Sequence, residues 1–558
     1  MTSIYGGPES TQKEQFPIAA WIWGHRLRTG QTWIEYMLEF LSVLSGYDYQ
    51  LGRGLRGGDA DLAYSIPKRL GLRRFIFYDG HEKSRDSRDT RALNELRDQL
   101  RRTMPTLNGH ADADLMEQVR SLLRSFSAIE EARSWYAKAL FPVHEEFLLW
   151  EALRKGSTKN NYTASVDDLE LSSLDKSMDF RARNFFARGG EIYYLILSAG
   201  TEHDPELRSR IGERLHHLLT NHNTTLGQIA QIIDRTWSDL ALNSDHEGMI
   251  TGKLGWILDP QCALYRQIAE DLDTFLDNQL DSLECLELLA HLISFHMLLY
   301  IYHRAHPASH PEGHAAGSCI EACRPELLID VLGEQDGGIM RNQSARSLRQ
   351  HEDWQLQQAY SFINQKISTW VNQYAGAPDL HERLDEEIRQ FFSTSGRKIK
   401  QDYDAQIKAV ERKYDPTATD RDLLIQIYSQ TVFSVLESEF RKNFLSVHRK
   451  IGRAIGMIAP RKGPQPRFVL GDTLLKTLIM ALLPRNAPPI PFGTLLERLY
   501  ERYGIIIGPG EVSKAGLLER LRINEEYYTR NRDALRDRML RAGLLQHYSD
   551  ATALVQRG

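Results

Sequence analysis

The sequence has very little cysteine. Four Cys in 558 residues cannot build the dense disulfide framework of small secreted domains. The amino terminus, residues 1–10, also lacks a basic segment followed by an apolar core, so it does not read as a signal peptide. Both absences predict a protein of the reducing cytoplasm.

Long apolar runs are missing as well. The most apolar stretch, residues 285–302, is interrupted by one Glu and two His. A membrane-spanning helix needs about 20 consecutive, mostly apolar residues. We therefore expect this stretch to be a buried core helix, and we expect no membrane partner.

Positive charge is not in excess. The chain has 69 Lys and Arg against 74 Asp and Glu, so its net charge is −5. Any contact with nucleic acid must therefore come from a local basic patch and not from the overall field. The 26% of charged residues indicates a globular chain, and at about 150 residues per domain the length predicts three or four domains.

Motifs for nucleotide binding and for common hydrolases are also lacking. Residues 248–254 hold a Gly and a Gly-Lys pair, but with three intervening residues instead of the four of a phosphate loop, and Leu254 stands where the magnesium-binding Ser or Thr is needed. No Gly-x-Ser-x-Gly occurs. We expect no nucleotide and no cofactor, and a non-catalytic role is favoured over an enzyme.

Apolar residues three and four positions apart recur along most of the chain, which predicts a mainly α fold. A Thr32/Glu35 capping box marks one helix start. We expect a multi-domain helical body with a C-terminal module of mixed α/β structure. The predicted segments are an N-terminal helical domain with a short strand near 74–79, a central helical domain, long helices with a basic neck, and the C-terminal module: residues 1–155, 156–378, 379–467 and 468–558.

A local basic patch does exist. From Arg441 to Gly471 the sequence has eight basic residues and no acid. Each phosphate that such residues neutralise releases counterions and adds affinity for a polyanion. We call residues 441–467 the basic stretch and take its cations as DNA-binding candidates: Arg441, Lys442, Arg449, Lys450, Arg453, Arg461, Lys462 and Arg467.

A compact pattern of helices and a hairpin follows the basic stretch. The last predicted helix carries several arginines, is capped by Thr529, and leads into a hairpin that turns at Ser549 and Asp550. An apolar strand begins at Ile505. The predicted helices are residues 474–483, 494–503, 514–522 and 530–542.

This order of elements resembles a winged helix-turn-helix. The resemblance implies that helix 530–542 enters the major groove of double-stranded DNA while the hairpin meets phosphates. It adds four candidates for DNA binding: Arg530, Arg532, Arg536 and Arg538. Asp533 and Asp537 lie on the same helix and would repel phosphate, and winged helices also serve as protein-interaction modules. Both kinds of partner stay open.

Two groups of residues could hold a metal. The first is a His/Cys cluster, in which imidazole and thiolate are zinc ligands, but its Cys pair has a wider spacing than common zinc ribbons. Its candidate ligands are His306, His310, Cys319 and Cys323. The second group is Asp330, Glu334 and Asp336, which could hold Mg²⁺ in a nuclease but has no suitably placed Lys. Ordinary core and loop roles are favoured for both groups.

The sequence therefore favours a non-catalytic scaffold subunit that binds DNA and other protein subunits. It is similar to accessory subunits of bacterial anti-phage defence systems. Two alternatives remain open. One is a metal-dependent nuclease or hydrolase whose carboxylates meet only in the fold. The other is a transcription regulator, although the 440 residues before the basic stretch exceed what a small-ligand sensor needs.

Overall fold

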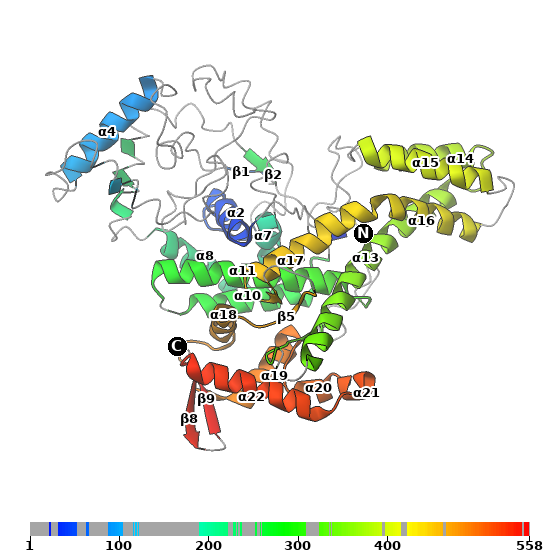
Figure 1. Cartoon of the computed structure of the whole chain (residues 1–558). Coiled ribbons are helices and arrows are strands. Elements are labelled where there is room, and N and C mark those ends of the chain that lie inside the picture. Colours follow the sequence, from blue (N-terminus) through cyan, green and yellow to red (C-terminus); the bar gives the residue numbers. More distant parts are fainter. Residues whose placement is uncertain are drawn as a thin grey trace. The chain divides into compact units, whose positions relative to one another are not determined.

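The structure is a computed structural model of the whole chain (Figure 1). The residues that it describes are 22–23, 32–52, 63–65, 87–103, 115, 118–119, 121, 189–220, 227–229, 231–232, 235–236, 251–253, 257, 259–278, 280–308, 323–333, 335, 338–392, 397–413, 421–460, 465–549 and 552–556. These residues are mostly helical with few strands, which confirms the mainly α prediction. The strand expected near residues 74–79 lies outside the described residues.

The chain divides into two compact units. Unit 1 comprises Met1–Thr29, Trp256–Gln267 and Ser294–Gly558, and unit 2 comprises Gly30–Gly255 and Ile268–Ile293. These bounds differ from the four predicted segments. The chain passes between the units more than once, so no division into consecutive segments could reproduce them.

Unit 2 is built on the pairing of α2 (Trp33–Gly46) with α7 (Gly189–Gly200). The predicted helix start is confirmed, since the carboxylate of Glu35 accepts a hydrogen bond from the backbone N–H of Thr32. The helices approach closely because Gly190 has no side chain, and a Cβ there would lie 2.5 Å from the backbone of Tyr36 and Phe40. The buried carboxylate of Glu39 accepts from the N–H of Gly190 at 2.7 Å, which satisfies a free donor of α7. Unit 2 also holds α4 (Ser87–Thr103) and the paired strands β1 (Ala63–Ser65) and β2 (Thr251–Lys253).

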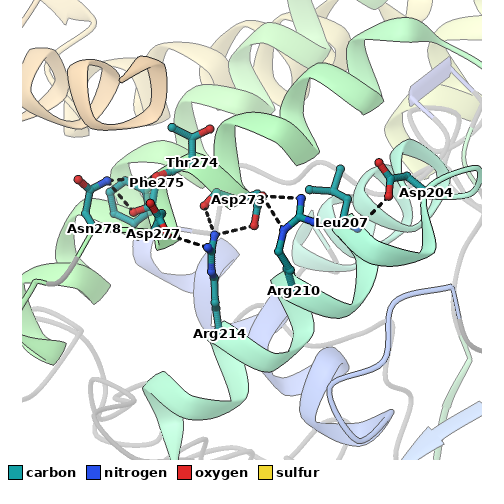
Figure 2. A network of polar contacts seen from close by, with 9 residues as sticks. All are labelled: Asp204, Leu207, Arg210, Arg214, Asp273, Thr274, Phe275, Asp277 and Asn278. Atoms are coloured by element: carbon teal, nitrogen blue, oxygen red, sulfur yellow. Dashed lines mark hydrogen bonds and ion pairs between the residues drawn. The ribbon is translucent and has the colours of Figure 1, made fainter. Parts of the chain in front are cut away.

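Two arginines join α8 (Pro205–Leu219) to α10 (Ala263–Leu276) in unit 2, as Figure 2 shows. Arg214 donates to the Asp273 carboxylate at 2.6 Å, to its carbonyl oxygen at 2.7 Å and to Asp277 at 2.7 Å. Arg210 bonds the same Asp273 from the preceding turn of α8, at 3.0 Å. Asp204 caps the start of α8 by accepting from the N–H of Leu207. One aspartate therefore fixes the register of two helices.

The predicted core helix is α11 (Ser282–Ala305), which contributes residues to both units. Among the described residues it is the one helix long and apolar enough to cross a membrane, and 94% of its most apolar window is buried inside the protein. A core helix of a soluble protein passes the same test of length and composition. The burial is consistent with the expected soluble protein.

Four helices follow one another in unit 1, as Figure 1 shows. The longest, α13 (Ile339–Gln373), packs along α16 (Arg421–Phe440), and α14 (Leu380–Phe391) and α15 (Arg397–Lys413) lie between them in the chain. Apolar side chains at helical spacing on α13 are buried, among them Ile363, Ile367 and Val371. The charged stretch from residue 379 is thus a set of packed helices.

The basic stretch is folded along most of its described length. It opens with a π-helical turn, η9 (Arg441–Leu445), that continues α16 into α17 (Ser446–Ala454). The antiparallel strands β4 (Ile458–Ala459) and β5 (Arg467–Phe468) follow. An amphipathic helix buries one face, so its cations are divided between the protein interior and solvent.

The C-terminal region contains four helices of more than five residues and a three-stranded sheet. The hairpin strands β8 (Leu545–Ser549) and β9 (Thr552–Val555) pair antiparallel, and β9 also pairs with β6 (Ile490–Pro491), so the strand order is β6-β9-β8. The predicted hairpin is confirmed, but Ser549, which was expected in its turn, is the last residue of β8 and pairs with Thr552. The helices are α18 (Asp472–Leu482), α19 (Phe492–Tyr503), α20 (Pro509–Lys514) and α22 (Glu525–Arg541), with the shorter α21 (Leu517–Leu521).

Helix α22 begins earlier than the sequence pattern indicates. Its N-cap is Asn524, whose side chain accepts from the N–H of Glu526 at 3.0 Å. The predicted cap, Thr529, lies inside the helix, and that prediction was wrong. The acidic first turn, Glu525 and Glu526, complements the helix dipole and explains the earlier start.

A parallel strand pair joins the C-terminal region to the rest of unit 1. Strand β3 (Leu327–Leu328) pairs with β7 (Ile505–Ile506). The segment 327–333 is a strand followed by a turn. The two regions share one apolar core, whose buried members are Leu328, Leu332, Met340, Tyr500, Ile506, Val512, Leu517 and Tyr528.

Candidate nucleic-acid interface

The first cations of the basic stretch lie on the surface of η9. Arg441 pairs with Glu437 one turn earlier, at 2.7 Å, and its side chain is 55% exposed. Lys442 beside it is exposed. An exposed ion pair within one helix contributes little stability and exchanges easily for another anion. Both residues therefore remain accessible to a phosphate.

Arg449 binds a carboxylate of α13. Its guanidinium donates two hydrogen bonds to the carboxylate of Glu352, one of them at 2.6 Å. The same carboxylate lies 3.2 Å from Nε2 of the buried His448. Burial alone would raise the pKa of Glu352, but the hydrogen bonds from His448 and Arg449 outweigh it and lower the pKa to about 2. Arg449 thus neutralises an interior carboxylate.

Arg467 has a similar role in β5. Its Nε donates to Asp330 at 2.6 Å, and the Asp330 side chain is completely buried. The other oxygen of Asp330 accepts from the N–H of Gly333 at 2.8 Å and fixes the turn after β3. A buried charge needs such a partner. The pairing gives Arg467 a structural role. Together, Arg467 and the N–H of Gly333 engage both carboxylate oxygens of Asp330, which was a candidate magnesium ligand.

The remaining cations of the stretch differ in exposure. Lys450 is exposed on α17, and Arg453, one turn later, is half-buried. Arg461 and Lys462 lie outside the described residues, between β4 and β5. Counting acids within the stretch missed both interior partners, because Glu352 and Asp330 are 97 and 137 positions away from their arginines.

The arginines of α22 are all engaged with nearby groups. Arg538 pairs with Asp472 at the start of α18, at 2.5 Å. Arg530 donates to the carbonyl oxygen of Gln335 at 3.4 Å. Arg532 and Arg536 both lie near Asp533, at 2.9 and 3.7 Å, on the same helix. Asp472 and Asp533 therefore offset part of the positive charge of these arginines.

The opposite face of α22 is buried and includes one polar side chain, that of Asn531. Asn531 accepts from the N–H of Val331 at 2.9 Å and donates to the carbonyl oxygens of Ile329 and Ile507 at 3.0 and 2.9 Å. Leu535 and Met539 continue the buried face, whereas Ala542 is exposed. Asn531 was missed because a lone Asn among arginines gives no sequence signal of burial.

The proposed metal ligands are not brought together in the part of the chain that the structure describes. His306 packs edge-on against Trp354 and accepts from the N–H of Ala308 at 3.2 Å, and Cys323 is buried. His310 and Cys319 lie outside the described residues, as do Glu334 and Asp336. Within the described residues no group of three or more His, Cys, Asp or Glu could hold a metal ion.

Comparisons with known proteins add no relative. No protein-family model, no curated protein and no solved structure matches this chain.

Proposed function

We propose that the C-terminal region is a winged-helix module and that the protein is a non-catalytic scaffold subunit that binds double-stranded DNA. The observation that supports the fold most strongly is the strand order β6-β9-β8, with β9 in the middle. Helix α18, strand β6, helices α19 and α22, and the β8–β9 hairpin follow in the order of a winged helix-turn-helix. Strand β7 and helices α20 and α21 are an insertion into that order.

The proposed DNA contact is made by surface cations of the basic stretch. Lys442 and Lys450 are exposed, and Arg441 is bound only to a neighbour on its own helix. Arg449 and Arg467 stay with their interior partners, because removing either from a buried carboxylate would cost more than a phosphate contact returns. Contacts to the phosphate backbone of DNA do not depend on which bases are present, so we propose binding without strong sequence preference.

A partner protein is the second proposed ligand, and the charge of α22 favours it there. The charged residues that are exposed or half-buried on α22 are of both signs: Glu525, Glu526, Arg530, Arg532, Asp533, Arg536, Asp537, Arg538 and Arg541. A helix that enters the major groove is expected to be strongly basic, whereas mixed charge suits a polar protein surface. We infer that α22 contacts another subunit while the basic stretch holds DNA.

Charge reversal tests the DNA proposal better than truncation does. Removing the C-terminal region would also remove β7 and Asn531 from the core of unit 1. The full chain with Lys442→Glu and Lys450→Glu keeps these contacts. Lys408→Glu on α15 is the matched control, because it makes the same charge change at an exposed position outside the basic stretch.

The measurement is the fluorescence anisotropy of a labelled duplex titrated at several salt concentrations. We expect the double variant to lose affinity by about tenfold or more and the log–log salt slope to fall by about 0.9 for each lost phosphate contact. The control should bind like the wild type. Equal affinity of all three proteins, or no binding by the wild type, would remove DNA from the proposal.

A further inference from the structure

A cysteine and a histidine at the ends of two helices lie close together in unit 1, and an arginine follows the histidine in the chain. Cys262 directly precedes α10, and its carbonyl oxygen accepts from the N–H of Tyr265 in the first turn. His303 and Arg304 lie in the last turn of α11. The Sγ of Cys262 is 3.9 Å from Nε2 and 4.0 Å from Nδ1 of His303. All three side chains are buried.

Arg304 and Cys262 both interact electrostatically with the hydroxyl group of Tyr300. Tyr300 donates its hydroxyl to the carbonyl oxygen of Trp23 at 2.5 Å, so the position of its ring is fixed. Burial raises the pKa of Tyr300, Arg304 opposes that rise, and Cys262 and the exposed Asp259 add to it. Cys262 and Arg304 are therefore both within electrostatic reach of one hydroxyl group.

This combination is the environment that stabilises a thiolate. The thiolate is the nucleophilic form of cysteine, and a helix start, an imidazolium and a guanidinium each favour it. At Cys262 a helix start, the imidazole of His303 and the guanidinium of Arg304 occur together. His303 can take the thiol proton, and Arg304 supplies positive charge that cannot be lost at physiological pH.

We propose that Cys262 is a modification site, a nucleophilic thiol that small hydroperoxides oxidise to sulfenic acid. The thiolate sulfur attacks one peroxide oxygen, an S–O bond forms, and the O–O bond breaks. The departing oxygen takes the proton held by His303 and leaves as an alcohol or as water. The sulfur is oxidised by two electrons and the peroxide is reduced by two. Because Cys262 is only 6% exposed, the site selects small oxidants.

The chain contains a matched internal control. Cys285, in α11, is 5% exposed, which is nearly the exposure of Cys262. Burial raises the pKa of the Cys285 thiol to about 12, and Glu284 and Asp281 add to the rise. The two thiols are thus nearly equally shielded, but Cys262 lies beside an imidazole and near a guanidinium, whereas two carboxylates act on Cys285. A difference between the oxidation rates of Cys262 and Cys285 therefore reports on the groups around each thiol and not on its solvent exposure.

The experiment uses the full chain with hydrogen peroxide. After quenching, the protein is denatured, the remaining thiols are alkylated, and each Cys peptide is quantified by mass spectrometry. We expect Cys262 to be lost about tenfold faster than Cys285, and to be recovered by a thiol reductant. Equal rates for the two cysteines would overturn the proposal.

The variant His303→Gln tests the role of the imidazole. It should slow the oxidation of Cys262 about tenfold and leave Cys285 unchanged. Cys285 also reports on folding, because an unfolded variant would expose it and raise its rate. If the variant unfolds, the test is made on the wild type, whose rate of alkylation by iodoacetamide at Cys262 is measured as a function of pH. The midpoint of this pH profile should lie below the ordinary thiol pKa of about 8.5. A midpoint at or above that value would contradict the proposal.

Discussion

Asn531 and Val331 are joined by a 2.9 Å hydrogen bond in which the backbone N–H of Val331 donates to Oδ1 of Asn531. The side-chain amide of Asn531 returns two hydrogen bonds, to the carbonyl oxygens of Ile329 and Ile507. One buried side chain thus replaces the partners that an extended sheet would give to the segment after β3. It also fixes α22 to that segment.

Replacing Asn531 should destabilise unit 1. In Asn531→Ala, two N–H groups, of Val331 and Leu332, and two carbonyl oxygens lose their bonds to this side chain. An unsatisfied buried polar group costs about 1–3 kcal/mol. We expect a loss of about 2–4 kcal/mol in the free energy of unfolding, measured by urea denaturation. Asn486→Ala at an exposed position is the control and should change little. A loss below that of the control would show that the bonds contribute nothing.

Gly504 should not tolerate a side chain. It ends α19 with φ of 71°, and a Cβ there would overlap the carbonyl oxygen of Pro325. Gly504→Ala therefore forces β3 and β7 apart in addition to straining the backbone, and we expect a loss of more than about 2 kcal/mol. Gly493, in the first turn of the same helix, has no atom within 4 Å of such a Cβ.

Gly493→Ala should accordingly stabilise the protein by about 0.5–1 kcal/mol, because alanine loses less backbone entropy in a helix. Thermal unfolding of the two variants side by side tests the pair. Similar midpoints for both would refute the close approach of Gly504 and Pro325.

Arg467 and Arg441 belong to the same acid-free stretch but should behave in opposite ways. Arg467→Ala leaves the buried Asp330 carboxylate without its partner, and we expect a loss of about 3–5 kcal/mol in unfolding free energy. Arg441→Ala removes an exposed pair within one helix and should cost less than about 0.5 kcal/mol. Chemical denaturation measures the loss of unfolding free energy for both variants. A small loss for Arg467→Ala would mean that Arg467 does not stabilise the fold and remains a candidate for phosphate binding.

Local patterns in the sequence predicted the helices and the hairpin well. The apolar spacing of α2 and the run from Leu474 before Pro484 depend only on neighbouring residues, as does the turn between β8 and β9. The pairing of β3 with β7 could not be predicted, because two-residue strands have no periodicity and Leu327 and Ile505 are far apart in the chain.

The candidate site was predicted less completely. The absence of acid between Arg441 and Gly471 is a fact of the sequence, but charge neutralisation depends on three-dimensional neighbours. Glu352 comes from α13 and Asp330 from the turn after β3, and each reaches its arginine only in the folded chain. A sequence pattern can thus indicate which cations exist, and only the fold separates structural from surface ones.

His351 predicts how the stability of unit 1 depends on pH. Its side chain is buried between Tyr302 and Trp354, and it lies 3.3 Å from the carbonyl oxygen of Glu326. Burial lowers the pKa of His351 from 6.5 to about 3, the hydrogen bond to Glu326 opposes the change, and His306 and His448 add to it. The folded protein therefore keeps this histidine neutral where the unfolded chain protonates it.

Because the unfolded state binds more protons between these values, stability falls as pH falls from 6.5 toward 3. One such group contributes about 1.4 kcal/mol per pH unit. The range from pH 6.5 to 4.5 isolates it from Glu352, whose contribution is lost only below its ordinary value of 4.5.

The variant His351→Phe keeps an aromatic ring between Tyr302 and Trp354 but cannot bind a proton. Losing the hydrogen bond to Glu326 shifts its stability by the same amount at every pH, so the slope and not the absolute value is compared. We expect the wild type to lose about 1.4 kcal/mol more per pH unit than the variant over this range, measured by urea denaturation. Parallel profiles would mean that His351 is protonated alike in the folded and unfolded chains, which complete burial without a carboxylate partner does not allow.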